Sequence, residues 1–242
     1  FVLRGSSNPG NVRMMLGAVR SNARMARINI SSDVWEAVNE NWMKLDALLA
    51  RPVGQTAVGE VLAAIRRAGT QVHGAFDGSI LRDEGYHFAR AGTFIERADS
   101  TARILDVKYY HLLPSSEMVG SGKDNFQWQS ILRSVSAHRS YRWVFIDTVR
   151  PLRIAEYLIL HRQMPRSLRS CYDEMTDALQ QLAILYGSRH PCHITAESTR
   201  DLLMDAEIQN IFQMGLHEFV QDLIARNNRL GHEISQAYHF TD

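Results

Sequence analysis

The apolar residues of this chain recur every three or four positions, the spacing that places side chains on one face of an α-helix. This spacing fills the stretches between the prolines, and no stretch shows the sustained two-residue alternation of a half-buried strand. Proline interrupts helices because it lacks an amide hydrogen, so the prolines are expected between helices or at their first turns. The pattern therefore predicts an all-α protein.

Capping signals set the predicted helix boundaries. Asn8-Pro9 is expected to open the first helix, and Ser31-Ser32-Asp33, with Glu36 three residues after Asp33, to open the second. The predicted helices cover residues 9–30, 33–49, 55–76, 83–113, 126–145, 152–161, 166–186, 196–204 and 207–239. The best candidate for a flexible loop is 115–124, and Asn227 is the only polar interruption in the apolar stripe of the last helix. Because the connections are short, we expect a single antiparallel bundle of eight or nine helices, forming one domain over residues 1–242.

Composition narrows the class of protein without naming an activity. A chain of 242 residues, 45% of them hydrophobic, can bury a core without disulfides or a structural metal. Its 27 basic and 26 acidic residues leave a net charge of +1, which argues against a nucleic-acid partner. No apolar run approaches the roughly 20 residues of a membrane-spanning helix. Two cysteines, Cys171 and Cys192, cannot form a disulfide framework, so we expect a cytoplasmic protein.

The helix predicted over 83–113 places charged residues among apolar ones. Asp99 and Arg103 are four residues apart and Arg103 and Asp106 three, spacings at which side chains meet on a helix. Glu96 and Arg97 diverge by about 100° and need partners on other helices. The candidate network comprises Arg90, Glu96, Arg97, Asp99, Arg103 and Asp106.

Buried charges persist only when they are paired, so we favour a buried ion network at these residues. On that interpretation Glu96→Gln costs about 3–5 kcal/mol of stability. The rival interpretation is a site for an anionic ligand or for a charged group of a partner.

Three segments together resemble one known family. Glu96-Arg97, continued by residues 103–107, resembles the hallmark segment of the bacterial alpha-E family, a predicted all-helical domain named for a Glu-Arg motif. Residues 8–36 are similar to the helical start of that family, and residues 165–171 to its later Pro-Arg-Ser helix opening. The resemblance covers essentially the whole chain. Members usually begin with an earlier helix that carries a first Glu-Arg motif, and since this chain opens at Phe1, we expect that helix upstream.

The resemblance implies a functional association. Genes of the family typically lie beside, or are fused to, genes for atypical ATP-grasp proteins that resemble peptide ligases, with transglutaminase-like proteins and an N-terminal-nucleophile hydrolase as frequent neighbours. It implies an accessory or scaffolding subunit of a peptide-modifying, amide-forming system, and assigns no catalytic residue. The alternative is an enzyme with a polar site around Glu96 and Arg97. We expect no cofactor.

A stripe of arginines on the first predicted helix is the second candidate for binding chemistry. Arg13, Arg20, Arg24 and Arg27 fall within about 60° of arc and can clamp a phosphate, a carboxylate or a partner. The simpler interpretation is that they flank the apolar face and pair with acids on neighbouring helices.

Metal and thiol chemistry have little sequence support. A di-metal bundle needs two Glu-x-x-His pairs, and only Glu84 and His87 have that spacing. His190-Pro191-Cys192-His193 lacks a second ligand pair, so we interpret it as a surface loop. Cys171 lies beside a predicted core stripe and is expected to be a buried, inert thiol.

Overall fold

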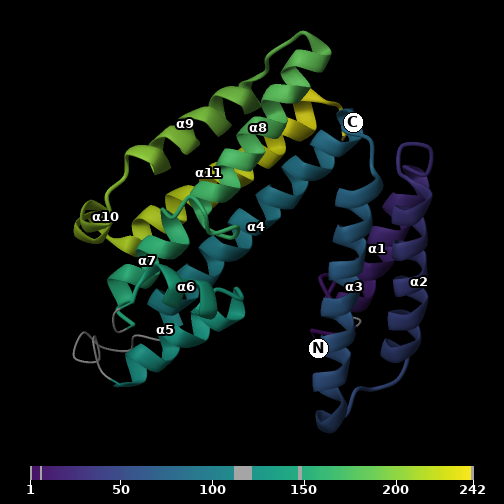
Figure 1. The fold of residues 1–242 in the computed structure, drawn as a ribbon, viewed down its shortest axis with the longest axis horizontal. Helices are drawn as coiled ribbons and strands as arrows, with labels where there is room; N and C mark the ends of the chain where they lie inside the picture. Colours follow the sequence, from purple (N-terminus) through teal and green to yellow (C-terminus); the bar gives the residue numbers. More distant parts are fainter. Residues whose placement is uncertain (1, 6, 112–121, 147–148, 241–242) are drawn as a thin grey trace. The chain divides into compact units, whose positions relative to one another are not determined.

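The computed structural model describes residues 2–5, 7–111, 122–146 and 149–240, and its regular elements are all helical (Figure 1). This part of the chain contains eleven α-helices, one short 3-10 helix and no strand. The all-α prediction is confirmed. The predicted count of eight or nine helices is wrong, because two of the predicted helices are each broken in two. The single antiparallel bundle stays a prediction.

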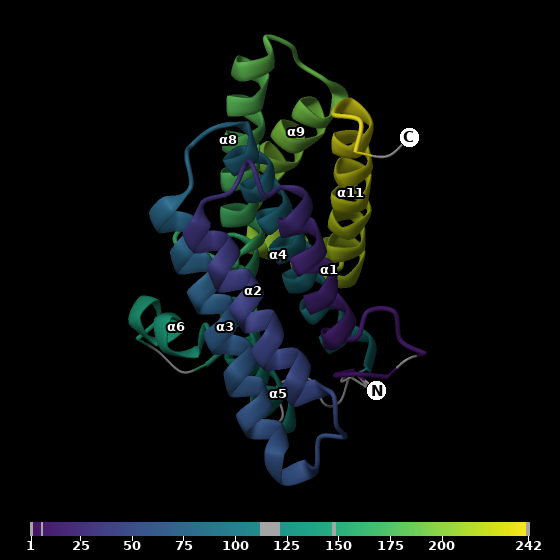
Figure 2. The ribbon, with the colours of Figure 1, turned by 90° about the vertical axis from the view of Figure 1, so that its right-hand side faces the viewer.

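The chain divides into two compact units, Phe1–Tyr86 and His87–Asp242. The first unit contains three long helices and the 3-10 helix: α1 (Val12–Met25), α2 (Ser32–Leu49), η1 (Gln55–Ala57) and α3 (Val58–Ser79). Helix α2 packs against both α1 and α3, and Figure 2 shows it between them. The buried residues of this unit lie mainly on α2, which is therefore its central helix.

Side-chain caps explain where the first two helices begin. The Asn11 side chain accepts a hydrogen bond from the amide of Met14, and the Ser31 side chain accepts one from the amide of Val34. Each cap satisfies an amide that has no partner within its own helix. The predicted opening at Asn8-Pro9 is therefore three residues too early, whereas the predicted opening at Ser31-Ser32-Asp33 is confirmed, with Ser31 as the cap.

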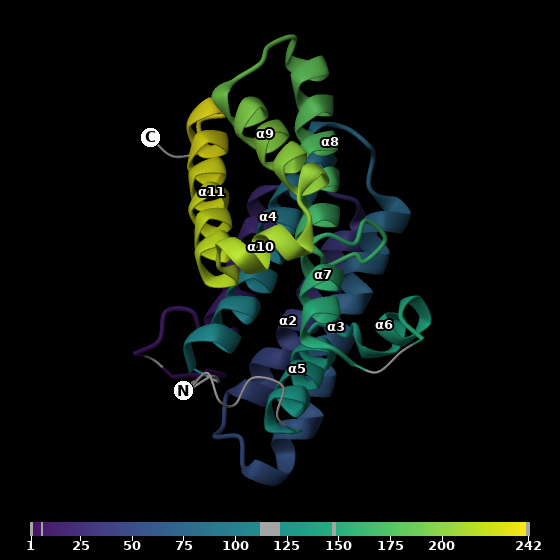
Figure 3. The same cartoon turned by 90° about the vertical axis from the view of Figure 1, so that its left-hand side faces the viewer.

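The second unit holds most of the hydrophobic core. Its helices are α4 (Glu84–His111, which begins in the first unit), α5 (Gly122–Ser134), α6 (His138–Val144), α7 (Pro151–Ile159), α8 (Leu168–Tyr186), α9 (Pro191–Asp205), α10 (Ile208–Met214) and α11 (Leu216–Ala237). Helix α9 packs against α8 and α11, and α10 lies against α11 (Figure 3). Leu105, Leu158, Leu179 and Leu230, from four different helices, are completely buried in one core.

Backbone geometry accounts for the two unexpected helix breaks. Ser136 adopts a positive φ of 58°, which separates α5 from α6 inside the helix predicted over 126–145. Gly215 adopts a φ of 106°, which separates α10 from α11 inside the helix predicted over 207–239. A positive φ ends the α-helical hydrogen-bond ladder and is adopted most readily by glycine.

None of the helices in the described part of the chain combines the length and hydropathy needed to cross a membrane.

Candidate functional site

Helix α4 carries the candidate network in the second unit, and only one side of this helix is buried. The buried apolar side chains, each 3% exposed or less, are Ala91, Phe94, Ala98, Ala102 and Leu105, and the buried polar ones are Thr101 and Lys108. They repeat at three and four positions, as expected for a single contact face. Glu96 stands two residues from both Phe94 and Ala98, about 200° around the helix, and is exposed. The predicted burial of Glu96 is therefore wrong, because α4 turns this residue away from its core face.

The ring of Phe94 lies beside two arginines of α4: Arg90 and Arg97, the arginine of the Glu-Arg pair. The guanidinium carbon of Arg90 lies 4.5 Å from the centre of the Phe94 ring, and that of Arg97 lies 5.0 Å from it. Both distances permit a cation–π interaction. Arg90 also donates a hydrogen bond to the Glu174 carboxylate on α8. The two arginines are thus held beside a buried ring, while Glu96 points elsewhere.

Two ion pairs account for the remaining members of the candidate network. Arg103 Nε lies 2.6 Å from Asp99 Oδ2, which confirms the predicted four-residue pair, and the hydrogen bond to Asp99 raises the pKa of Arg103. Asp106 Oδ1 lies instead 2.6 Å from Nδ1 of His217 on α11, a partner that sequence spacing within one helix does not reveal. Arg103 is 56% exposed. The Asp99–Arg103 pair lies at the protein surface, where an ion pair contributes about 0–1 kcal/mol, whereas the side chains of Asp106 and His217 are only 21% and 28% exposed.

The side-chain amide of Asn227 is buried next to the Glu-Arg pair. Asn227 on α11 is 5% exposed, and its Nδ2 donates to the backbone carbonyl of Ile95 over 3.1 Å. Its Oδ1 accepts a hydrogen bond from the hydroxyl of Tyr172 on α8 over 3.3 Å. Gly231 lies one turn further along α11, and a Cβ there would stand 3.7 Å from Ile95 Cδ1, so α11 approaches α4 closely. The one polar residue in the last apolar stripe was the sequence signal for this contact.

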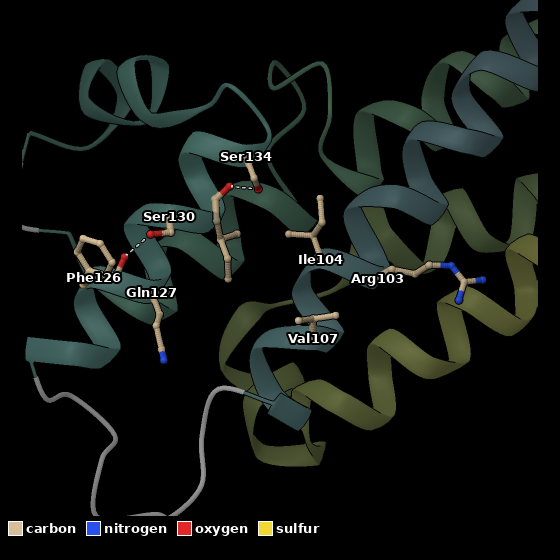
Figure 4. Close-up of a pocket in the computed structure, with 8 residues that line it drawn as sticks. Arg103, Ile104, Val107, Phe126, Gln127, Ser130 and Ser134 are labelled. Carbon is tan, nitrogen blue, oxygen red and sulfur yellow. Dashed lines mark hydrogen bonds between the residues drawn. The ribbon is translucent and has the colours of Figure 1, made fainter. Parts of the chain in front are cut away.

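An apolar groove lies between the second half of α4 and α5 (Figure 4). Its volume is about 470 Å³, and it is lined by Arg103, Ile104, Val107, Phe126, Gln127, Ser130, Ile131 and Ser134. Figure 4 shows the Arg103 guanidinium pointing away from α5. Val107 is 47% exposed and Phe126 is 64% exposed. An exposed apolar surface of this kind is typical of a contact site for another molecule.

The polar residues of this groove are engaged within the protein. Ser130 and Ser134 donate to the carbonyls of Phe126 and Ile131 on their own helix, over 2.9 and 2.7 Å. The Gln127 side-chain carbonyl accepts a hydrogen bond from the buried Lys108 ammonium over 2.8 Å. The groove therefore offers mainly carbon atoms to whatever contacts it.

Comparison with known proteins adds one decisive finding. Residues 1–239 match the model of a family described as a predicted alpha-helical domain with a conserved ER motif, called Alpha-E. The chain belongs to the Alpha-E family. Glu96-Arg97 is the only Glu-Arg dipeptide in its sequence. No curated protein and no solved structure matches the chain.

In this Alpha-E chain the arginine stripe of the first unit turns toward α2. Arg13 Nε lies 2.7 Å from Asp46 Oδ1, and this contact lowers the pKa of Asp46. Arg20 donates to Asn39 over 2.8 Å, and its guanidinium carbon lies 4.1 Å from the Trp42 ring centre.

The other two members of the stripe are less tightly held. The guanidinium carbon of Arg27 lies 5.8 Å from the Trp35 ring centre, and Arg24 is exposed. The prediction of pairing with acids is thus confirmed for Arg13, whereas Arg20 and Arg27 contact tryptophans.

The His190–His193 segment is the first turn of α9, so its prediction as a surface loop is wrong. Pro191 occupies the first helical position. Nδ1 of the His193 ring accepts a hydrogen bond from the His190 backbone amide over 2.9 Å. Its Nε2 lies 3.1 Å from the Leu179 carbonyl, which fits a neutral imidazole that donates from Nε2. His193 is 1% exposed, and its ring caps a helix and joins it to α8.

The two cysteines of this Alpha-E chain are buried thiols. Both are completely buried, and burial raises the pKa of Cys171 to about 12 and that of Cys192 to about 11. The thiolate is the reactive form, so neither side chain is activated at neutral pH. The burial predicted for Cys171 is confirmed, and its raised pKa is consistent with the inert thiol expected there. Within the described ranges, no three His, Cys, Asp or Glu side chains gather as a set of metal ligands.

Proposed function

We propose that this Alpha-E protein is an accessory helical subunit that docks onto an ATP-grasp ligase-like partner in a cytoplasmic, amide-forming bacterial system. The observation that carries the proposal is the groove between α4 and α5, whose exposed walls are apolar and whose polar side chains are already bonded. Apolar side chains of the partner occupy this groove. A transglutaminase-like protein is a further candidate partner.

The charged residues of α4 favour an accessory role over a catalytic one. Glu96 is exposed, while Arg97 lies against the Phe94 ring, so the two side chains do not converge on one point. Asp99 is bonded to Arg103, and Asp106 is bonded to His217. An enzyme site needs titratable groups that converge on a reacting atom, and this arrangement distributes them along the helix.

Binding to the purified ligase-like partner, measured by isothermal titration calorimetry, tests the proposal. Phe126→Ser removes the most exposed apolar wall of the groove and should weaken binding by at least about tenfold, or 1.4 kcal/mol. The matched control is Trp143→Ser on α6, which removes an exposed aromatic residue outside the groove lining. Equal binding by wild type and the Phe126 variant would contradict the proposal, and so would ATP-dependent amide formation by this chain alone.

A further inference from the structure

The first unit leaves an uncharged face of α1 exposed to solvent. No residue of α1 is buried, although Arg13 and Arg20 bond to α2. Met14, Met15 and Val19 are each about half exposed, and Met25 is 76% exposed. Methionine side chains adapt to varied apolar partners, so a face of this composition suits binding.

A groove over α2 adjoins this face, with α1 and α3 as its walls. It is lined by Leu16, Val19, Val38, Asn41, Trp42, Ile65, Ala68, Gly69, Val72 and His73. The five residues from α3 form one helical stripe at the spacing of a packing face. The cavity measures about 220 Å³, below the roughly 300–1,000 Å³ of small-molecule sites, and it suits a few side chains of another helix.

One basic residue stands beside the groove on each of its two walls. On α1, Arg13 is paired with Asp46, whereas the guanidinium carbon of Arg20 lies 4.1 Å from the ring centre of Trp42, which lines the groove. On α3, residues 61–76 contain Arg66 and Arg67 and no acidic residue. Arg66 falls within about 20° of His73 around α3, at the edge of the groove, whereas Arg67 lines a separate pocket on the other side. Charge complementarity therefore favours a ligand with acidic flanks.

We propose that this groove binds an amphipathic helix of a partner protein, with acidic residues on both sides of its apolar stripe. Apolar side chains at the positions i, i+3 or i+4, and i+7 of that helix enter between α1 and α3. Its carboxylates face Arg20 on the α1 side and Arg66 on the α3 side. This site is separate from the groove between α4 and α5 and stands whether or not that groove binds the ligase-like partner.

Fluorescence anisotropy with designed peptides tests the charge requirement. The probe is a fluorescein-labelled helix of about 20 residues with a leucine stripe flanked by glutamates, titrated with the full 242-residue chain. The matched probe carries lysines in place of the glutamates. The glutamate peptide should bind at least about tenfold more tightly, a preference that falls as salt is added.

Two matched pairs of variants test the location. Gly69→Phe fills the groove, whereas Gly74→Phe lies on the same helix outside the lining, and a Cβ at either glycine has no atom within 4 Å. Both replace a helical glycine, so neither is expected to weaken the fold. Gly69→Phe and Arg66→Glu should each weaken glutamate-peptide binding by at least about tenfold, with Gly74→Phe and Arg67→Glu within about twofold of wild type.

Three results would overturn this proposal. The first is equal binding of the glutamate and lysine peptides, which would remove the charge argument. The second is unchanged binding by the Gly69→Phe variant, which would place the peptide elsewhere. The third is a wild-type dimer in analytical ultracentrifugation that Gly69→Phe dissociates, which would assign the groove to a second copy of the chain.

Discussion

The Asn227 side chain links α11 to α4 and α8, and its contribution to the free energy of unfolding can be measured. Asn227→Leu removes the acceptor of the buried Tyr172 hydroxyl and the donor to the Ile95 carbonyl. A buried polar group left without a partner costs about 1–3 kcal/mol, so the free energy of unfolding in urea should fall by that amount. Adding Tyr172→Phe to Asn227→Leu should recover part of the loss, because both polar partners are then gone. Strictly additive effects of the two substitutions would argue against the contact.

The exposed position of Glu96 changes the expected effect of Glu96→Gln on the free energy of unfolding. Since its side chain is exposed, Glu96→Gln leaves no buried charge uncompensated, and its cost should be within about 0.5 kcal/mol, as for most surface substitutions. The melting temperature of the variant should therefore match that of the wild type within one or two degrees, as a rough limit. A loss near 3–5 kcal/mol, the range for a broken buried pair, would restore the buried network and refute the exposed position.

His161 gives the stability of the second unit a defined pH dependence. Burial lowers the pKa of His161 below its ordinary value of 6.5, and its Nδ1 is buried without a hydrogen bond to any residue that the structure describes. Between the lowered pKa and 6.5 the unfolded chain binds more protons than the folded chain, so acidification favours unfolding. The urea midpoint should fall between about pH 7.5 and pH 5.5. In His161→Phe, which keeps a ring beside Tyr157, this fall should be smaller, and an equal fall in both proteins would contradict the assignment.

At the scale of elements, the break between α10 and α11 depends on Gly215. Its φ of 106° is unfavourable for any residue with a Cβ, and the Glu218 side chain occupies the space that a Cβ would need. Gly215→Ala should therefore destabilise the protein by about 1–3 kcal/mol in thermal denaturation. Gly74→Ala on α3, where space is open, should instead stabilise it by about 0.5–1 kcal/mol. Similar effects at the two glycines would show that the chain continues helically through 215.

Local signals predict elements well when they act within a few residues. Ser31 caps α2 as expected, because the hydroxyl and the amide that it accepts are three residues apart. Pro191 also stands where proline favours a first helical turn, but the cap there is a histidine ring, which is not among the usual capping side chains. The break at Ser136 likewise carries no glycine or proline to mark it.

Contacts between different helices limit how much of the candidate site can be predicted from the sequence. Periodicity identifies α4 as a largely apolar helix but does not say which of its sides packs against the core. For this reason the prediction that Glu96 is buried is wrong. The Asp99–Arg103 pair was accessible because both residues lie on one helix. The contacts of Asp106 with His217 and of Arg90 with Glu174 join segments far apart in the sequence, which spacing alone cannot connect.

At the scale of the whole molecule, each unit presents its own apolar groove. The groove of the second unit lies beside the helix of the Glu-Arg motif, and that of the first unit has Arg20 beside its Trp42 and Arg66 near its His73. Burial of apolar surface is the main source of association energy, and charge at its edge selects the partner. Two such surfaces on one chain fit the proposed accessory role, in which the protein acts by binding other proteins.

Hydrogen–deuterium exchange of this Alpha-E chain, alone and mixed with the purified ligase-like protein proposed as its partner, is the most direct test of docking. The account predicts that complex formation slows amide exchange in α5 (Gly122–Ser134) and in the second half of α4, the two walls of the larger groove. Exchange in α9, whose residues do not line that groove, should be unchanged. A stable complex that protects other helices and leaves α4 and α5 unaltered would contradict the account, as would the absence of any complex.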